Sequence, residues 1–526
     1  MNLVNQLADR ANNHPGQMAL IDAQQSITYG DLYQYVCGAS AQLRQNGLKP
    51  GDTVLILQPV GIPLYISLLA TFHAGLTAMF IDPSAGKTMI RNSLSLHPPK
   101  ALIGTGKAHL LRLTNPEIRR IPRHYHSSGW APCSRKWNPT PARLTPPSAV
   151  APDALALITF TSGSTGMPKA AGRSHAFLLA QHTALAESLD YLEGEVDLVT
   201  LPVFTLANLA SGLTSVLADT DLRFPARANS AAIATQCQTH QVTRCAASPA
   251  FFEKLMRDHQ FPAFKAIYTG GAPVFPCLLD EIQSAHPTLD VVTVFGSTEA
   301  EPIAHIRWRD TSEQDHQDMR SGKGLLVGKP VSVTQLRIIP DQSGRRDQSG
   351  RPIAPLTEKE LQSLLLPPGE IGEIIVTGDH VLKSYLNGQG NEENKIKVGD
   401  TIWHRTGDAA FLDPSGRVWL VGRCSAAIRR PNQPPAYPFG IECAAMSHPA
   451  VTRCALILHR RQISLFVEGA LTQSQRQSLK NQLAHLPVEH IQTIARIPVD
   501  KRHNAKINYP ELRKKLPGPK GISSKF

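Results

Sequence analysis

The sequence lacks the short patterns that mark several common classes of protein. No two of its eight cysteines are spaced as C-x-x-C, so neither a redox pair nor a paired-cysteine zinc site is indicated. The first residues, MNLVNQLADR, do not place basic side chains before an apolar run, as a secretory signal peptide does. Scattered thiols in a long chain without such a signal are typical of a reducing compartment. We therefore expect a cytoplasmic protein.

A second feature is the absence of charged residues from one long segment. Residues 53–81 contain no Asp, Glu, Lys or Arg, and the run is long enough to cross a bilayer. However, Pro59, Gly61, Pro63 and Gly75 interrupt it. These breaks predict a strand, a turn, a buried helix and a second strand, and no transmembrane segment.

Charge is unevenly distributed along the chain. The formal net charge is +12, and residues 426–526 carry 16 basic against 5 acidic side chains, which leaves residues 1–425 near neutrality. Such asymmetry is typical of a solvated basic face or of a surface for an anionic partner. No basic motif interleaved with aromatic residues and no recognition-helix pattern is present, so we expect no nucleic-acid partner.

The length of 526 residues exceeds one ordinary core and predicts at least two domains. From residue 153 onward, strand-like and helix-like segments alternate, which predicts parallel α/β layers with ligands at the carboxyl ends of strands. We expect strands at 153–160, 196–204, 242–247, 264–271 and 290–297, and helices at 174–189, 207–219, 249–259 and 276–286. Residues 120–152, rich in Pro, Arg and His, are expected to form a surface loop.

After about residue 325 the pattern changes. Segments 369–378 and 416–423 look like strands around turns, which predicts a β-rich subdomain. Residues 341–351 repeat the pentad DQSGR and predict a polar hairpin or a disordered duplication. The sequence becomes irregular after Arg423, so we expect one domain at 1–423 and a smaller one at 424–526.

The most informative segment is TFTSGSTGMPKA, residues 159–170, which follows a predicted strand. Its glycines allow backbone N–H groups to turn toward an anion, its hydroxyls are donors, and Lys169 adds a cation. It is not a Walker A loop, because a lysine does not directly follow the last glycine, and it contains no G-x-S-x-G nucleophile elbow. The loop therefore predicts a phosphate-binding site.

This loop resembles the [S/T]-S-G-[S/T]-T-G-x-P-K signature of the adenylate-forming superfamily, which includes acyl-CoA ligases, adenylation domains of peptide synthetases and luciferases. The resemblance covers nearly the whole chain, because further motifs follow in the family's order: YTGGAP (268–273), FGSTEAEP (295–302), GEIIVTG (372–378), HRTGDAAFLDPSGRVWLVGR (404–423) and RHNAKI (502–507). It implies a large AMP-binding domain, built from two layered α/β subdomains and a β-rich subdomain, followed by a small mobile α+β lid.

The resemblance also implies the reaction, in which ATP and Mg²⁺ activate a carboxylic acid to an acyl adenylate and pyrophosphate departs. The β- and γ-phosphates would be held by Thr161, Ser162, Gly163, Ser164, Thr165, Gly166 and Lys169. Adenine would stack on Phe295 against the backbone of Gly270, Gly271, Ala272 and Pro273. The ribose hydroxyls would donate to Asp408, with Arg423 assisting. Thr298 would contact the α-phosphate, Glu299 would bind Mg²⁺, and Lys506 would be the catalytic lysine of the lid.

Three departures from the family pattern bear on the second half-reaction. Ser425 stands at the expected hinge, prolines replace the expected glycine loop, and residues 201–212 lack the aromatic-plus-histidine pair found in many acyl-CoA ligases. These features weaken the case for CoA. Together with the motif sequences, they are most similar to the β-lactone synthetases of olefin biosynthesis and to fatty acid CoA ligase-like proteins.

Four alternatives follow. In the first, a fatty or β-hydroxy fatty acid is adenylated, and the adenylate of a β-hydroxy acid is closed to a β-lactone when its own hydroxyl displaces AMP. A related ligase transfers the acyl group to CoA or to an acyl carrier protein, for which the basic C-terminal region offers a docking surface, as it would for a downstream enzyme. A third alternative activates an amino or aryl acid. A non-catalytic relative would be expected to lack Lys506 or Glu299, and both are present.

Overall fold

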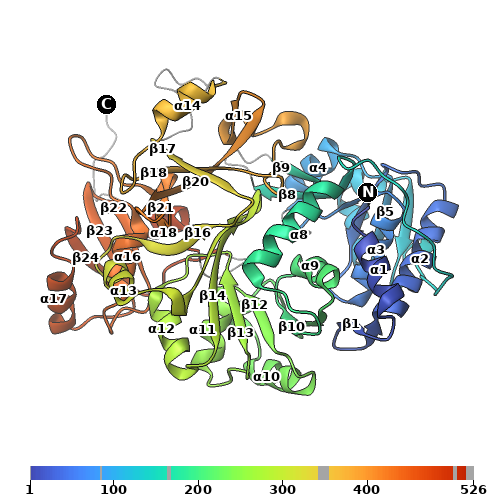
Figure 1. The fold of residues 1–526 in the computed structure, drawn as a ribbon, viewed down its shortest axis with the longest axis horizontal. Coiled ribbons are helices and arrows are strands. Elements are labelled where there is room, and N and C mark those ends of the chain that lie inside the picture. Colours follow the sequence, from blue (N-terminus) through green and yellow to red (C-terminus); the bar gives the residue numbers. More distant parts are fainter. Residues whose placement is uncertain (1, 83–85, 163–167, 342–354, 501–505, 517–526) are drawn as a thin grey trace.

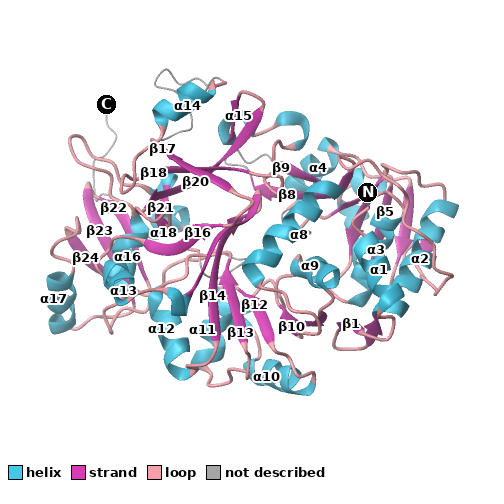
Figure 2. Ribbon diagram, viewed as in Figure 1, coloured by secondary structure: helices cyan, strands magenta, loops and turns pink. Residues whose placement is uncertain are grey.

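The computed structural model describes residues 2–82, 86–162, 168–341, 355–500 and 506–516 (Figure 1). Gly163, Ser164, Thr165 and Gly166 of the predicted phosphate loop lie outside these ranges, as does the duplicated pentad except for Asp341. The described part contains three sheets of fourteen, seven and three strands, with helices packed between and around them (Figure 2). The mixed α/β fold predicted from the sequence is confirmed.

The seven-stranded sheet lies in the N-terminal third, in the order β7-β6-β5-β3-β4-β8-β9. Its strands are β3 (Thr53–Leu57), β4 (Thr77–Met79), β5 (Ala101–Gly104), β6 (Arg123–His126), β7 (Arg135–Lys136), β8 (Leu155–Ser162) and β9 (Pro168–Ser174). The helices of this region are α1 (Asn5–Asn13), α2 (Tyr29–Gln45), α3 (Ile62–His73), α4 (Lys87–Leu96), α5 (Gly106–His109), α6 (Leu111–Thr114) and α7 (Pro116–Arg119).

The uncharged run 53–81 forms β3, the buried helix α3 and β4, as predicted from its prolines and glycines. Gly61 precedes α3, Pro63 lies in its first turn, and Gly75 takes a left-handed φ of 73° between α3 and β4. Among the described residues, no helix is both long and apolar enough to cross a membrane.

The surface loop predicted for residues 120–152 is wrong in part. Strands β6 and β7 extend the seven-stranded sheet at its edge, and Tyr125 and Trp137 are buried there in an edge-to-face ring contact. The prolines and arginines of this segment concealed two short strands, because β6 pairs with β5 outside the segment and β7 then pairs with β6, and local composition does not reveal this pairing.

The fourteen-stranded sheet has two parts. Parallel strands β10 to β14 are sandwiched between α8 and α9 on one face and α10 to α12 on the other, as their alternating buried residues require. These elements are β10 (Val196–Val199), β11 (Thr214–Leu217), β12 (Arg244–Ala247), β13 (Ala266–Gly270), β14 (Asp290–Ser297), α8 (His175–Leu189), α9 (Phe204–Ser211), α10 (Ser230–Thr239), α11 (Pro249–Arg257) and α12 (Pro276–Ala285). Strands β1 (Met18–Ile21) and β2 (Ser26–Thr28) add an edge.

The expected strand 196–204 and helix 207–219 are corrected by the structure. The strand ends at Val199, the helix α9 begins at Phe204, and Gly212 ends that helix with a left-handed φ of 78°. The following residues form the buried strand β11. Short apolar segments of this kind suit either a buried helix or a buried strand, and only Gly212 separates them in the sequence.

The remaining strands of this sheet are antiparallel and continue directly from β14 through the hairpin to β15 (Ala300–Arg307). They are β16 (Leu325–Pro330), β17 (Gln335–Ile339), β18 (Gly372–Thr377), β19 (Lys395–Val398), β20 (Thr401–Leu412) and β21 (Val418–Arg423), with helices α13 (Glu313–Arg320), α14 (Glu358–Leu364) and α15 (Asn391–Asn394). The predicted β-rich region is therefore continuous with the α/β sheet.

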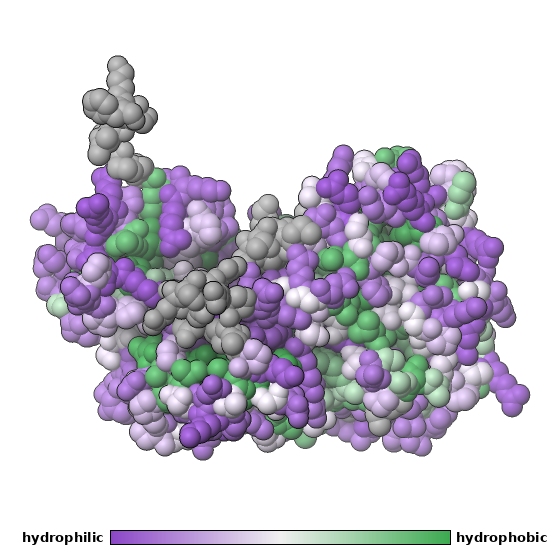
Figure 3. All heavy atoms as spheres, turned by 90° about the horizontal axis from the view of Figure 1, so that it is seen from above, coloured by the Kyte–Doolittle hydropathy of each residue, from purple (hydrophilic) through white to green (hydrophobic). Residues whose placement is uncertain are grey.

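Residues after Arg423 form the three-stranded sheet of β22 (Cys454–His459), β23 (Gln462–Glu468) and β24 (His490–Ile494) with helices α16 (Pro438–Met446), α17 (Gln473–Gln482) and α18 (Tyr509–Lys515). One hydrophobic cluster lies entirely within residues 428–491. Helix α16 packs against β21 and α13, which brings this region beside the large sheet (Figure 1). The outer surface seen from above is mostly hydrophilic (Figure 3).

Candidate active site

A cleft of about 1020 Å³ is lined by residues of the large sheet and of the C-terminal region. Ten residues predicted from the motifs meet in its wall: Lys169, Gly271, Ala272, Pro273, Phe295, Thr298, Glu299, Asp408, Arg423 and Lys506. Thr161 and Ser162 end β8, the strand that leads into the predicted phosphate loop. Motifs that lie up to 337 residues apart in the sequence thus share one cavity.

Gly270 does not line the cleft and has a packing role. A Cβ at this position would lie 2.3 Å from the carbonyl oxygen of Val294 on the neighbouring strand β14, closer than any side chain tolerates. Gly271 follows with a φ of 76°, so the chain turns sharply at the end of β13. The pair therefore brings the backbone of residues 271–273 to the edge of the cleft.

Phe295 lies on β14, two residues after Thr293 and two before Ser297, and all three line the cleft. Thr293 and Phe295 alternate along the strand and so point to the same face, and Ser297 joins this wall beyond a register shift between Phe295 and Ser297. The side-chain oxygens of Thr293 and Ser297 are buried and have no hydrogen-bond partner within the described part of the chain. This wall offers an aromatic surface together with free polar groups.

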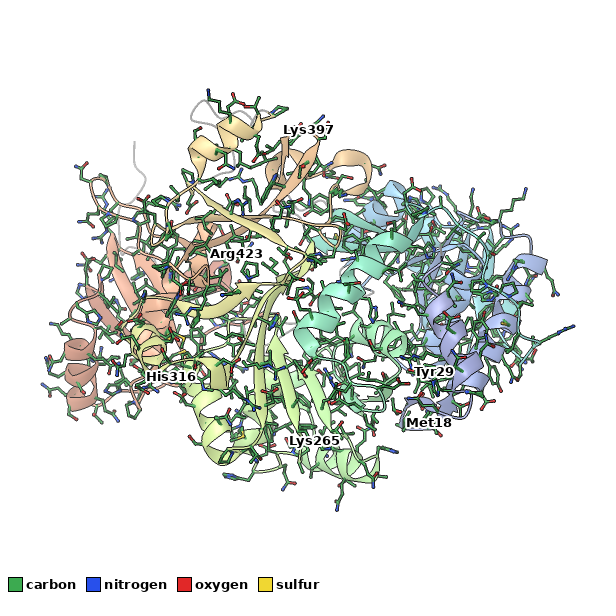
Figure 4. All side chains as sticks on the ribbon, in the orientation of Figure 1. Met18, Tyr29, Lys265, His316, Lys397 and Arg423 are labelled. Atoms are coloured by element: carbon green, nitrogen blue, oxygen red, sulfur yellow. The ribbon has the colours of Figure 1, made fainter. Side chains whose placement is uncertain are left out.

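Asp408 and Arg423 face each other across the neighbouring strands β20 and β21 and form an ion pair of 2.7 Å between Oδ1 and Nη1. Arg423 is labelled in Figure 4. The Asp408 backbone N–H donates to the Thr406 hydroxyl at 3.0 Å. No group of the described residues hydrogen-bonds to the remaining carboxylate oxygen, Oδ2.

The part of β20 before Asp408 is fixed by a buried ion pair that the motifs did not indicate. Arg405 donates to Glu373 Oε2 at 2.5 Å, and Glu373 Oε1 accepts from the Gly407 N–H at 3.2 Å. Both side chains are about 1% exposed. Gly407 has a φ of 72°, a conformation that glycine adopts readily, and the Glu373 carboxylate holds this irregular point of β20 in place and thereby sets the position of Asp408.

Thr298 and Glu299 form the turn between β14 and β15, and three groups hold them. The Arg173 guanidinium donates to the Thr298 carbonyl at 2.7 Å, and burial lowers the pKa of Arg173. The Tyr385 hydroxyl donates to Glu299 Oε1 at 2.7 Å, and the Leu382 N–H donates to the Glu299 carbonyl at 2.7 Å. One oxygen of the Glu299 carboxylate is therefore engaged with a neutral donor, which leaves the group able to bind a hard cation.

Two lysines flank the ring of Tyr385, the residue that donates to Glu299, and of these Lys169 lines the cleft. Lys169 is 3.4 Å from Glu393 Oε2 and 5.5 Å from the centre of the Tyr385 ring. Lys395 lies 5.4 Å from the same ring, and burial lowers its pKa to about 7. Sequence reasoning found only Lys169, because it belongs to a contiguous motif. Tyr385, Glu393, Lys395 and Arg173 were missed, since no local pattern marks them.

Lys506 lines the cleft from the C-terminal side. Its N–H donates to Asp500 Oδ1 at 2.9 Å, and its carbonyl accepts from the Asp500 N–H at 2.8 Å. Further along, the Tyr509 hydroxyl donates to Glu442 Oε1 at 2.9 Å. The buried Glu442, which also accepts from the Leu456 N–H, has its pKa raised by burial to about 7. These contacts fix the backbone on both sides of Lys506.

Comparison with known proteins identifies the family. The AMP-binding enzyme family matches residues 7–386, which is most of the chain. The chain belongs to the AMP-binding enzyme family. It is an ATP-dependent, AMP-forming acid ligase, and enzymes of this family generally use Mg²⁺ with ATP.

Among curated relatives, the olefin beta-lactone synthetase of Stenotrophomonas maltophilia is 29% identical over 512 residues, which cover 93% of this chain and 90% of the relative. That of Xanthomonas campestris pv. campestris is also 29% identical, over 96% and 94% of the two chains. A 2-succinylbenzoate–CoA ligase of Bacillus licheniformis is 24% identical, over 86% of each.

Solved structures of similar proteins confirm the fold of this chain. The amide bond synthetase McbA from Marinactinospora thermotolerans aligns with a TM-score of 0.78 at 19% identity, over 98% of this chain and 99% of that one. The anthranilate CoA ligase AuaEII aligns with a TM-score of 0.79 at 16% identity, over 98% and 97%. The alignments extend through the C-terminal region.

Proposed function

We propose that the enzyme adenylates a fatty acid that carries a β-hydroxyl group and then closes the acyl adenylate to a β-lactone. One observation carries this proposal: the similarity to two olefin beta-lactone synthetases runs over more than nine-tenths of the chain, including the segment after Arg423. The departures at Ser425 and in the proline-containing segment that follows agree with a second step that needs no external thiol.

In the first step, a carboxylate oxygen attacks the α-phosphorus of ATP, the new O–P bond forms and pyrophosphate leaves with the electrons of the broken P–O bond. Phe295 and residues 271–273 would hold adenine, and Asp408 would accept from the ribose hydroxyls. Thr298 and Lys506 would donate to the oxygens on which negative charge develops. Stabilisation of developing charge by fixed donors is usually the largest single contribution to the rate enhancement. Lys169 would hold the departing phosphates together with residues 161–166.

Glu299 fits the requirements of a Mg²⁺ ligand. Mg²⁺ in phosphoryl-transfer sites is bound through one or two carboxylates together with substrate phosphates. Glu299 lies in the cleft wall with Oε1 held by Tyr385, and its second oxygen would be the one offered to a metal ion. When bound, Mg²⁺ would neutralise phosphate charge.

In the second step, the β-hydroxyl oxygen attacks the acyl carbon, the bond from that carbon to the AMP oxygen breaks, and the hydroxyl proton passes to solvent. Because nucleophile and carbonyl belong to one molecule, the effective concentration of the hydroxyl is very high. In this structure the segment that would otherwise approach a thiol contacts Asp341: the Tyr437 hydroxyl donates to Asp341 Oδ2 at 2.8 Å, and Arg429 forms an ion pair with the same oxygen.

We also propose that residues 424–526 act as the mobile lid. Their hydrophobic cluster within 428–491 and the hinge position of Ser425 support a boundary after Arg423. Lys506 would then reach the reacting atoms only in one lid orientation.

The experiment is incubation with ATP, Mg²⁺ and a long-chain β-hydroxy acid, with product masses measured with and without CoA. A lactone has the mass of the acid less one water and forms without CoA. The matched control is the acid of equal length without the hydroxyl, which would stop at the acyl adenylate. A product that forms only with CoA and contains CoA would overturn the lactone step and leave adenylation intact.

The second candidate is thioester formation with CoA or an acyl carrier protein. It is favoured by the 24% identity to 2-succinylbenzoate–CoA ligases over 86% of the chain. The basic residues after 426 would suit the CoA phosphates or an acidic carrier. The same incubation separates it from the first candidate.

A further inference from the structure

The segment Leu382–Tyr385 donates two hydrogen bonds to Glu299. The Leu382 N–H donates to the Glu299 carbonyl, and the Tyr385 hydroxyl donates to its Oε1, both at 2.7 Å. An isolated bridge between Val381 and Ala300 extends the contact by one residue on each side. Backbone and side chain of Glu299 are thus both set by a segment more than eighty residues away, which is itself a loop between β18 and β19.

Lys395 contacts this loop from strand β19. It is the first residue of β19, and its ammonium donates to the Leu382 carbonyl. Its Nζ lies 5.4 Å from the centre of the Tyr385 ring and 3.2 Å from His404 Nδ1. The one ammonium therefore contacts both residues through which the loop reaches Glu299.

A lysine is a costly choice for this position. Its side chain is partly buried, and among the described residues no carboxylate lies within 4 Å of its ammonium, while the second cation Lys169 lies against the same ring. Taking an ammonium out of water without an ion-pair partner is unfavourable, and a nonpolar side chain would fill the space at lower cost. A cation at this position is therefore expected to serve the site, and the negative charge of Glu299 favours it there.

We infer that Lys395 is a positioning residue for Glu299: it holds Leu382 and Tyr385 in the arrangement that orients the carboxylate toward the metal ion. This inference rests on the proposed function of Glu299 as the Mg²⁺ ligand. Tyr385 orients the carboxylate directly, and Lys395 acts through it.

The test compares Lys395→Met with Lys397→Met. Lys397 is a matched control, because it lies two residues along the same strand, is exposed, and is labelled at the outer edge of the molecule in Figure 4. Electron paramagnetic resonance titration of Mn²⁺ into the full-length enzyme with a non-cleavable ATP analogue gives metal affinity without turnover. We expect Lys395→Met to weaken Mn²⁺ binding about tenfold and Lys397→Met to change it less than twofold.

Tyr385→Phe and Glu299→Gln complete the set. Tyr385→Phe removes one hydroxyl and leaves the ring, so it should fold normally and weaken Mn²⁺ binding severalfold. If Lys395→Met and Tyr385→Phe both bind Mn²⁺ as the unaltered enzyme does while Glu299→Gln does not, the inference about Lys395 is wrong and the proposed role of Glu299 stands. If Glu299→Gln also binds Mn²⁺ normally, the proposed role itself is wrong.

Discussion

The Tyr509 hydroxyl donates to Oε1 of Glu442 at 2.9 Å and so ties the segment after Lys506 to the buried helix α16. Lys506 itself is exposed and projects from this anchored segment into the cleft. Its neighbourhood is crowded with basic side chains, including Arg513, Lys514 and Lys515 in α18. What distinguishes Lys506 from them is its place in the cleft wall.

We predict that Lys506→Ala lowers the rate of adenylation about 10²- to 10³-fold and leaves ATP affinity within about twofold. The reason is that its ammonium would act on charge that develops during the reaction. Pyrophosphate exchange and equilibrium binding of an ATP analogue measure the two effects. Lys514→Ala, which alters an exposed lysine eight residues along, is the control, and equal losses in the two variants would contradict a specific role for Lys506.

Glu442 predicts a dependence of stability on pH. Burial raises its pKa from 4.5 to about 7, so the folded protein keeps a proton that the unfolded chain releases above pH 4.5. This contribution to the free energy of unfolding is complete below pH 4.5 and is lost as the pH rises to about 7. It amounts to about 3 kcal/mol at most.

Urea unfolding at pH 5 and pH 7.5 tests this. Glu442→Gln keeps an acceptor for Tyr509 and Leu456 but cannot ionise, so it should lose less stability than the unaltered protein between the two pH values. An identical pH dependence in both proteins would show that Glu442 does not titrate in this range.

Asp408→Asn is predicted to weaken ATP binding about tenfold, because an amide can accept less strongly from the ribose hydroxyls and disrupts the 2.7 Å ion pair with Arg423. The KM for ATP measures this, with the KM for the acid as an internal reference. Asp400→Asn, at an exposed position just before the same strand, should leave both constants unchanged.

Gly270→Ala is predicted to lower the free energy of unfolding by at least about 2 kcal/mol and to weaken ATP binding, because the new Cβ would press on the Val294 carbonyl at 2.3 Å. Gly16→Ala is the control, since no atom lies within 4 Å of the Cβ built there. Thermal unfolding of the two variants decides the matter, and equal melting temperatures would refute the close approach of β13 and β14.

The sequence alone predicted the parts of the candidate site that form contiguous motifs at strand ends, such as residues 271–273 and Thr298–Glu299. It did not predict the residues that contact these motifs from distant parts of the chain. Tyr385 and Lys395 reach Glu299 through a loop whose position depends on the pairing of β19 with β20, and Arg173 reaches Thr298 from the strand after the phosphate loop. These contacts depend on long-range register, which no local pattern contains.

The same distinction explains the errors in the fold. A run of buried apolar residues predicted one helix over 207–219, where Gly212 divides a helix from a strand. The composition of residues 120–152 predicted a loop, although β6 pairs in parallel with β5 and buries Tyr125. In each case tertiary pairing overrode the local preference.

The hairpin of β14 and β15 joins the parallel and antiparallel parts of the fourteen-stranded sheet into one hydrogen-bonded ladder. The groups proposed to bind adenine, metal and ribose all lie on that ladder or at its hairpin turn, namely Phe295, Glu299, Asp408 and Arg423. One continuous sheet therefore sets the spacing between them. A nucleotide bound there would meet groups held by one continuous sheet. In the proposed lid movement, the residues beyond Arg423 would bring Lys506 to these groups.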